Sequence, residues 1–458
     1  MIETVNPATG EVIERYEEHD ESALAEKLAR AWARWHDDWR YRPLDERLAV
    51  LSSAAEMLEA RRDDLAMLVT TEMGKPITAA RAEVDKCARL CRHYVEHAEA
   101  YLDVEHLETE AERSYVRFDA LGPVFAIMPW NFPLWQVMRF AVPAVAAGNV
   151  GLLKHASGTT GCALAIERLF ADAGLPEGGF TTLLIDHAAA TEVIADPRVR
   201  GVTLTGSDRA GRTVGRTAGE HLKKTVLELG GSDPCIVLDD ADLEQAVRGA
   251  VASRYLNAGQ SCINAKRIIV ARTVYEEFIE RFRAEVEALA VGDPTDESTD
   301  MGPLARTDLR DTVHDQVRRT LDHPHGGTLV TGGEPVDGPG AYYRPTVIRD
   351  VDPQAPAAAE EVFGPVAALL DAEHDDAAVA IANSSRFGLG AAVWTGDPDR
   401  GERLAARIES GMVFINEVVK SDPRLPFGGV KDSGHGRELA AQGLREFTNA
   451  KTVWVGRP

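Results

Sequence analysis

Cys262 stands in a setting that suits a reactive thiol. It lies in residues 257–264, a run of small and amide side chains (Asn-Ala-Gly-Gln-Ser-Cys-Ile-Asn) without a second cysteine. A thiol reacts only as its thiolate, so a nucleophilic cysteine needs nearby dipoles or charges and some access. A structural role is the alternative, because free cysteine is among the most buried residue types. Glu228 in Leu-Glu-Leu-Gly-Gly and Asn131 in Pro-Trp-Asn-Phe-Pro favour the chemical interpretation.

These three residue types together suit the oxidation of an aldehyde. A Cys262 thiolate would add to the carbonyl carbon. The Asn131 amide and the Cys262 backbone N–H would hold the oxyanion, where the loss of one donor costs ~3–4 kcal/mol. Hydride transfer to a nicotinamide would leave a thioester, and Glu228 would activate the water that releases the acid. The alternatives are that Asn131 caps the turn after Pro129 and that Glu228 is a surface carboxylate at a strand end.

Composition sets the class of protein that can carry this chemistry. The 458 residues predict two or three domains, and 44% hydrophobic with 27% charged residues is typical of a soluble globular protein. The net charge of −23 argues against nucleic acid and anionic membrane surfaces as partners. No apolar run approaches the ~20 residues of a membrane span, and the N-terminus does not resemble a signal or transit peptide. We therefore expect a cytoplasmic enzyme.

The cysteines predict neither disulfides nor a metal site. Five cysteines scattered over this length suit a reducing compartment. Cys87 and Cys91 would share one helix face, but no matching pair of ligands follows them. We interpret both as small residues at a helix interface and expect no bound metal.

Alternating strands and helices would position the candidate residues. Residues 22–100 repeat apolar side chains at intervals of three and four, which predicts consecutive amphipathic helices. Beyond them, strands alternate with helices, as in a parallel, doubly wound α/β sheet. Ligands bind beyond the carboxyl ends of such strands, which here carry Asn131, Lys154 and Gly206. The buried strands are predicted at 124–128, 148–154, 181–185 and 199–205, and the helices at 162–173 and from 209.

A second alternating region predicts another α/β domain. Its strands are expected at 234–238, 266–270 and 391–394, with a long helix at 274–289. The last strand, 451–455, is short and apolar, so we expect it to pair with another strand, for example in a second subunit. Lys154 has a simpler alternative as a lysine whose stem lies along apolar surface.

Six motifs in order resemble the NAD(P)-dependent aldehyde dehydrogenase superfamily across nearly the whole chain. They are Pro-Trp-Asn-Phe-Pro at 129–133, Leu-Thr-Gly-Ser at 204–207, Leu-Glu-Leu-Gly-Gly at 227–231, Gly-Gln-Ser-Cys at 259–262, Glu-Val-Phe-Gly-Pro at 361–365 and Pro-Phe-Gly-Gly-Val-Lys-Asp-Ser-Gly at 426–434. The resemblance implies an α/β fold with a Rossmann-type cofactor domain, an α/β catalytic domain and a small β oligomerisation element. It implies NAD or NADP as cofactor and a homodimer or homotetramer.

The resemblance also implies a role for particular residues. Cys262 would be the nucleophile, Glu228 the general base and Asn131 part of the oxyanion hole. Lys154 would contact the adenosine ribose, and Glu361 the nicotinamide ribose. The remaining residues expected near the cofactor are Trp130, Ser157, Gly206, Ser207, Leu229 and Phe363.

Within the superfamily, the chain resembles the shorter succinate-semialdehyde dehydrogenases of bacteria and archaea. Arg139 stands where such enzymes carry an arginine for the substrate carboxylate, and a guanidinium can hold a carboxylate through two parallel hydrogen bonds. The loop 420–425 resembles their substrate loop. The substrate residues implied are Arg139, Trp135, Ser421, Arg424 and Phe427. We therefore expect oxidation of succinate semialdehyde, or a similar short semialdehyde, to the acid.

Three departures bear on specificity. Ser157 stands where many NAD-preferring relatives carry a glutamate, so repulsion of a 2′-phosphate is removed and NADP can be accepted. Leu256 occupies the approximate place of a second substrate arginine in longer relatives. Asn264 replaces an extra cysteine of redox-switched relatives, which argues against a local regulatory disulfide.

Domain ranges and rival functions follow from the same resemblance. The cofactor domain is expected at 1–106 and 122–231, the catalytic domain at 232–425 and the oligomerisation element at 107–121 and 440–458. A broad aliphatic aldehyde dehydrogenase is the near alternative, with Arg139 serving structure. A coenzyme A-acylating enzyme is disfavoured because it needs no water-activating base such as Glu228. A non-catalytic binding protein is the third class.

Overall fold

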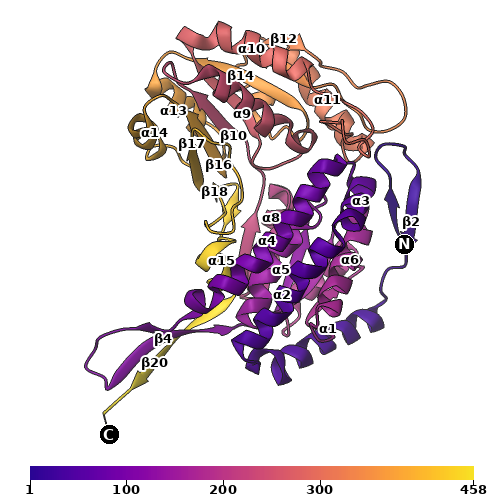
Figure 1. Ribbon diagram of the computed structural model, residues 1–458, viewed down its shortest axis with the longest axis vertical. Helices are drawn as coiled ribbons and strands as arrows, with labels where there is room; N and C mark the ends of the chain where they lie inside the picture. The colour runs from indigo at the N-terminus through magenta and orange to yellow at the C-terminus, as the bar shows by residue number, and fades with distance from the viewer. Residues whose placement is uncertain (458) are drawn as a thin grey trace.

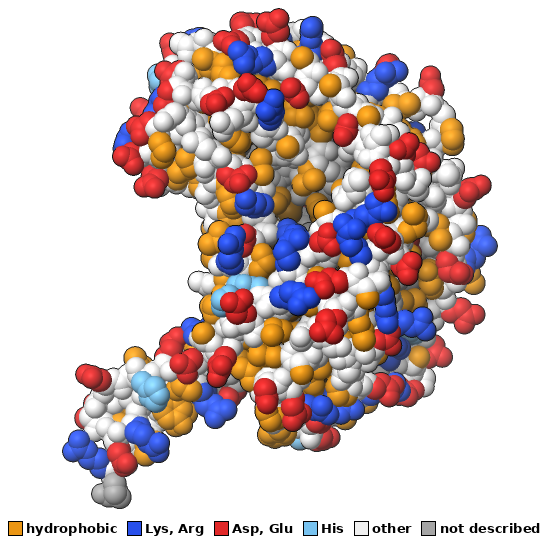
Figure 2. All heavy atoms as spheres, viewed as in Figure 1, with side chains coloured by type: hydrophobic (Ala, Val, Ile, Leu, Met, Phe, Trp, Pro, Cys, Tyr) orange, Lys and Arg blue, Asp and Glu red, His pale blue; other side chains and the backbone are white. Residues whose placement is uncertain are grey.

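Two largely parallel β-sheets, one in each of two lobes, organise the chain (Figure 1). The computed structural model describes residues 1–457. A narrow arm of strands leaves the lower lobe and carries the C-terminus (Figure 1). The face shown in Figure 2 is hollowed between the two lobes, and acidic and basic side chains mix along its rim. The predicted α/β class is confirmed.

The sheet of the first lobe has six strands in the order β19-β9-β8-β5-β6-β7. All are parallel except β19, which runs antiparallel to β9. Helices connect the parallel strands, because a crossover between parallel neighbours needs such a connection. The strands are β5 Pro123–Met128, β6 Val150–His155, β7 Phe180–Thr182, β8 Gly201–Thr205, β9 Lys224–Glu228 and β19 Gly434–His435, and the helices are α5 Trp135–Ala147, α6 Thr160–Asp172, α7 His187–Ala195 and α8 Asp208–Glu220.

A layer of N-terminal helices packs beside this sheet. The predicted helical region contains α1 Glu21–Asp37, α2 Leu44–Ala60, α3 Arg62–Met73 and α4 Ile77–Leu102. The longest, α4, packs against α2, α3 and α5, and it buries Cys87 and Cys91. This places one face of α4 directly against α5, which begins just after the loop that holds Asn131.

The second lobe has a seven-stranded sheet in the order β12-β13-β14-β11-β10-β16-β17, parallel except for β12. The strands are β10 Asp233–Val237, β11 Ala265–Ala271, β12 Thr328–Thr331, β13 Thr346–Arg349, β14 Val366–Ala372, β16 Gly390–Trp394 and β17 Met412–Ile415. The helices are α9 Leu243–Tyr255, α10 Tyr275–Glu287, α11 Thr307–Leu321, α12 Pro356–Ala359, α13 Asp375–Asn383 and α14 Pro398–Ala405. Each sheet has its own hydrophobic core.

The remaining strands form small sheets. The arm pairs β20 Thr448–Val455 with β4 Arg113–Ala120, and β4 with β3 Glu105–His106, all antiparallel. The other pairs are β1 Ile2–Val5 with β2 Val12–Tyr16 and β15 Phe387–Gly388 with β18 Val430–Lys431. Helix α15, Ala440–Glu446, packs on α4 and α5 of the first lobe, so the C-terminal part of the arm begins only at Thr448.

Strand positions agree with the sequence predictions more closely than strand lengths do. The strand predicted at 181–185 is only Phe180–Thr182. The change from one sheet to the other falls between Glu228 and Asp233. No helix within residues 1–457 has both the length and the apolarity to cross a bilayer.

Candidate active site

A strained turn presents Cys262. Between α9 and β11 the chain forms a short 3-10 segment, Leu256–Gly259, in which Asn257, Ala258 and Gly259 all have positive φ. Left-handed backbone is unfavourable for residues other than glycine and persists only where its surroundings hold it. A side chain at position 259 would collide with the carbonyl of Gly364. The strain is thus stored directly before the candidate nucleophile.

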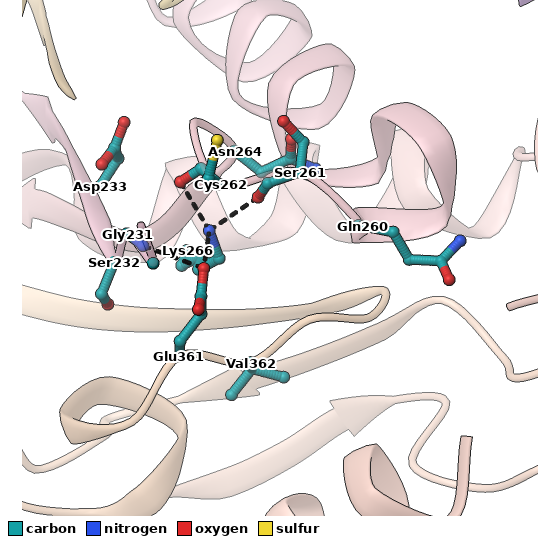
Figure 3. A network of polar contacts seen from close by, with 12 residues as sticks. Gly231, Ser232, Asp233, Gln260, Ser261, Cys262, Asn264, Lys266, Glu361 and Val362 are labelled. Carbon is teal, nitrogen blue, oxygen red and sulfur yellow. Dashed lines mark hydrogen bonds and ion pairs between the residues drawn. The ribbon is translucent and has the colours of Figure 1, made fainter. Parts of the chain in front are cut away.

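A buried lysine holds the backbone of Cys262 through hydrogen bonds. Lys266, at the start of β11, donates hydrogen bonds to the carbonyl oxygens of Ser261 and Cys262, at 2.8 Å each. Its ammonium lies 3.6 Å from Glu361 Oε1, and the same oxygen accepts a hydrogen bond from the Gly231 N–H at 2.9 Å. Figure 3 shows these contacts converging on Lys266. Lys266 therefore ties Cys262 to the loop of Glu361.

The loop with Asn131 is bonded to the same turn. Asn131 follows the end of β5, as predicted from the strand pattern. Its Nδ2 donates to the Gln260 carbonyl at 3.0 Å, while Asn257 Nδ2 donates to the Asn131 carbonyl at 2.7 Å. The Asn131 amide has a second N–H, which these bonds leave available for an oxyanion. Two loops more than 120 residues apart in sequence are thus held in one geometry.

Eight of the predicted residues line one pocket with a volume of about 250 Å³. They are Trp130, Asn131, Gly206, Ser207, Leu229, Cys262, Glu361 and Phe363. Trp130 and Phe363 meet edge to face with ring centroids 5.7 Å apart, which forms an aromatic wall. Pro129, Gln136, Thr205, Gly230 and Leu309 complete the lining. The predicted nucleophile, amide donor and cofactor residues therefore meet in one place.

Whether a dinucleotide fits depends on which helix N-termini beside the pocket are free to bind its phosphates. Glu83 accepts hydrogen bonds from the Leu134 and Trp135 N–H groups at the start of α5, at 2.9 Å each. Glu72 accepts from Gly161 and Cys162 at the start of α6, at 2.9 and 3.0 Å. Protein carboxylates thus occupy both of these anion-binding ends. The α8 N-terminus has only Ser207 as its side-chain cap, and Gly206 and Ser207 line the pocket, so it suits a pyrophosphate.

Two predicted cofactor residues stand outside the lining of this pocket. Lys154 is half-buried near the end of β6, and burial lowers the pKa of its ammonium. Ser157 is exposed and begins a 3-10 turn that ends at Thr159. Lys154 lies near the carboxyl end of β6, the strand next to β5, and Ser157 follows that end, where an extended cofactor would continue.

The Cys262 side chain is half-buried, and its surroundings favour the thiol over the thiolate. Burial raises the pKa of Cys262 to about 12, against the lowering effect of the Lys266 and Arg139 charges. The expected electropositive neighbours are therefore present, but desolvation outweighs them. A proton acceptor is needed when the carbon–sulfur bond forms.

Glu228 is a buried carboxyl without a hydrogen-bond partner. It ends β9, is 2% exposed, and neither oxygen meets a donor within residues 1–457. Burial and the nearby Glu438 raise its pKa well above the usual range, while Arg139 and Arg437 oppose the shift. Glu228 is therefore not the surface carboxylate of the alternative interpretation. Buried surroundings suit a group that transfers protons. Glu228 does not line the pocket with Cys262.

The predicted substrate residues form a second group beyond this pocket. Arg139 is buried, forms an ion pair with Glu438 and lies 4.4 Å from the Phe427 ring centroid. Trp135 and Ser421 are also buried and both contact Lys86. Arg424 is exposed and pairs with Asp422, so this arginine stands apart from the group.

Sequence reasoning did not single out Lys266 as a site residue, nor Glu438, Gln260 or Lys86. The sequence did contain a signal for Lys266, because a lysine at the start of an apolar strand must find buried acceptors. Glu438 follows the glycine-rich motif by a few residues and pairs with a residue almost 300 positions away. No local pattern predicts such a partner.

Comparisons with known proteins agree with this geometry. The model of the aldehyde dehydrogenase family matches residues 1–453. A Synechocystis protein named probable succinate-semialdehyde dehydrogenase (NADP+) is 50% identical over 454 residues, covering 99% of each chain. An Escherichia coli succinate semialdehyde dehydrogenase (NAD(P)+) is 49% identical over 456 residues, covering 99% of this chain and 98% of its own. A crystal structure of succinic semialdehyde dehydrogenase from Streptococcus pyogenes with NADP+ has a TM-score of 0.97 and 39% identity, covering 100% of both chains.

Proposed function

The chain belongs to the aldehyde dehydrogenase family, and on that premise we propose that it oxidises succinate semialdehyde to succinate with NADP, accepting NAD as a second cofactor. The observation that carries the proposal is the single pocket in which Cys262, Asn131 and Glu361 meet beside the α8 N-terminus. The names of the two relatives and of the solved structure support the choice of substrate.

The first step is addition of the Cys262 sulfur to the aldehyde carbon. The Cys262 thiol first gives its proton to solvent water, and the thiolate then forms the carbon–sulfur bond while the carbonyl oxygen becomes an oxyanion. The free N–H of Asn131 and the backbone N–H of Cys262 are the donors assigned to that oxyanion, and their loops are bonded to each other before substrate arrives. A nicotinamide cofactor, when bound, accepts the hydride of the aldehyde carbon.

The second step is release of the acid from the sulfur. The acyl group is then a thioester on Cys262, and hydrolysis needs a water molecule whose proton goes to a base. We assign this role to Glu228, because its oxygens have no protein donor and remain free to accept a proton. Removal of one such base typically slows a reaction about 100- to 10,000-fold. The base also distinguishes a hydrolytic enzyme from one that passes the acyl group to coenzyme A.

The cofactor side of the pocket supports NADP. Gly206 and Ser207 would hold the pyrophosphate at the α8 N-terminus, and Glu361 would accept from the nicotinamide ribose. Trp130, Leu229 and Phe363 would contact the nicotinamide end. The Lys154 ammonium and the Ser157 hydroxyl would meet the ribose phosphate, since neither repels a 2′-phosphate as a carboxylate would.

The assembly and location of the enzyme are part of the proposal. The arm leaves the body of the molecule, and its terminal strand β20 exposes Trp454 at 51%. An exposed strand edge with an aromatic side chain is a pairing surface. We propose a homodimer or homotetramer joined through this arm, in the cytoplasm, where the five free cysteines remain reduced.

One observation favours a second candidate. Arg139 is already paired with Glu438, so it serves structure as well as, or instead of, the substrate carboxylate. A broad aliphatic aldehyde dehydrogenase would need no such carboxylate contact. Comparison of succinate semialdehyde with butanal, which has the same number of carbons and no charge, separates the two functions.

The test is the initial rate of NAD(P)H formation from succinate semialdehyde, with NADP and NAD in parallel. We expect the higher kcat/KM with NADP and a loss of at least about 1000-fold in Cys262→Ala. Butanal serves as the control substrate. Turnover of butanal without turnover of succinate semialdehyde would replace the proposal by the broad aliphatic function.

A further inference from the structure

We propose that Lys86 is the cation that recognises the remote carboxylate of the substrate, and so determines specificity for a semialdehyde. The inference rests on the proposed function, because it names the residue that selects the charged aldehyde. Lys86 lies on α4, outside every motif that carries the family resemblance. The proposal therefore places a residue of the N-terminal helical layer in contact with the substrate.

Lys86 lies where three separate segments meet. Its ammonium donates to Ser421 Oγ at 2.6 Å, and it lies 4.0 Å from the centroid of the Trp135 ring. Trp135 begins α5, and the next residue, Gln136, lines the pocket that contains Cys262. The first turn of α5 therefore connects the reacting sulfur to Lys86.

Lys86 differs from the buried cations Lys75 and Arg139 because it has no carboxylate partner among the described residues. Lys75 forms a buried ion pair with Glu83, and Arg139 forms one with Glu438. Each pair is close to neutral as a unit. Within residues 1–457 no carboxylate oxygen lies within 4.0 Å of the Lys86 ammonium, which has only a hydroxyl and an aromatic face as partners. A carboxylate is the group that this ammonium lacks.

Burial strengthens the interaction that an incoming carboxylate would make with Lys86. Lys86 is half-buried, and desolvation together with the Arg139 charge lowers its pKa to about 8. An incoming carboxylate favours the charged form of the lysine and gains a charge-assisted hydrogen bond. Such a bond is stronger than one between neutral groups, so its loss weakens binding about 10- to 100-fold.

Arg139 then has a supporting role beside Lys86. Its guanidinium contacts Glu438, Phe427 and Thr205, the last at 3.5 Å, and these partners hold it in place. The Arg139 charge contributes to the lowered pKa of Lys86, although its own ion pair with Glu438 is complete. Lys86 and Ser421 provide the donors that are free to turn toward a ligand.

The experiment compares KM for succinate semialdehyde and for butanal in Lys86→Met, with saturating NADP. Methionine keeps most of the length of the side chain and removes its charge. We expect KM for succinate semialdehyde to rise about 10- to 100-fold and KM for butanal to change less than about twofold. Lys86→Arg retains a cation and should recover most of the loss. Equal changes for both substrates, or no change, would overturn the role of Lys86.

A second measurement separates this inference from the proposed function. Succinate should inhibit butanal oxidation competitively in the wild type, and Lys86→Met should weaken that inhibition about 10- to 100-fold. If the wild type oxidises succinate semialdehyde but Lys86→Met changes neither value, only the inference fails. If the wild type oxidises butanal alone and succinate does not inhibit, the proposed function fails with it.

A matched control tests whether loss of any half-buried lysine has the same effect. Lys223 is also half-buried and donates to the carbonyls of Asp196 and Val199, away from the pocket. Lys223→Met should leave both KM values within about twofold of the wild type. Butanal turnover by each variant reports whether its active site is folded.

Discussion

Two glutamates are buried in the same lobe, yet their surroundings are opposite. Glu83 is 4% exposed, pairs with Lys75 and accepts from the Leu134 and Trp135 N–H groups. Glu228 is 2% exposed and has no hydrogen-bond partner within residues 1–457. Burial alone therefore does not distinguish a structural carboxyl from a functional one. The partners do.

The difference teaches what each carboxyl can do. The bonds of Glu83 hold the start of α5, and thereby the loop with Asn131, in a fixed position. The ion pair and the two donors already engage the oxygens of this carboxylate. Glu228 has free lone pairs and a pKa raised by burial and by Glu438, so its carboxyl holds a proton and acts as a base once that proton has been released. One glutamate gives geometry and the other gives chemistry.

The largest expected effect is on rate, at Glu228. Glu228→Gln keeps the shape of the side chain and removes the base, so steady-state formation of acid should fall about 100- to 10,000-fold. The measurement is kcat for succinate semialdehyde with NADP, with circular dichroism to show an unchanged fold. Acid formation at the wild-type rate would show that another group activates the water.

The second effect is on stability, at Glu83. Glu83→Gln leaves the Lys75 ammonium buried without its partner, and breaking a buried ion pair costs about 3–5 kcal/mol. The urea midpoint of unfolding should therefore fall, while the kcat of the folded fraction stays within about tenfold of the wild type. A large loss of kcat with an unchanged midpoint would reverse the assignment of the two glutamates.

The double variant Lys75→Met/Glu83→Gln is the control for that prediction. It removes both charges, while the glutamine oxygen can still accept from the α5 N-terminus. We expect it to unfold at a higher urea concentration than Glu83→Gln alone, because no uncompensated charge remains. Equal midpoints for the single and double variants would show that the hydrogen bonds, rather than the charge, make the difference.

The same contrast shows what sequence could and could not predict. Asn131 and Gly206 were predictable because both follow strands of one parallel sheet, and Cys262 because of its motif and its small and amide neighbours. The contacts of Lys86 with Ser421 and of Arg139 with Glu438 join residues about 300 or more positions apart. They depend on how α4, α5 and the C-terminal segment pack, which residue periodicity does not encode. The high pKa of Cys262 has the same origin, because desolvation is a property of the packed pocket.

The smallest effect concerns stability against pH, again at Glu228. The pKa of Glu228 is raised in the folded protein, so the folded state binds this proton more tightly than the unfolded state does. Below the ordinary carboxyl pKa of about 4.3 both states are protonated, and the group does not affect unfolding. As pH rises above that value the unfolded state ionises first, so the wild type loses stability from this group. Glutamine cannot ionise, and Glu228→Gln should melt at a higher temperature than the wild type, with a gap that widens from pH 5 to pH 7. Glu83→Gln should melt below the wild type throughout, and a pH-independent gap for Glu228→Gln would mean that Glu228 is ionised and satisfied in the folded protein.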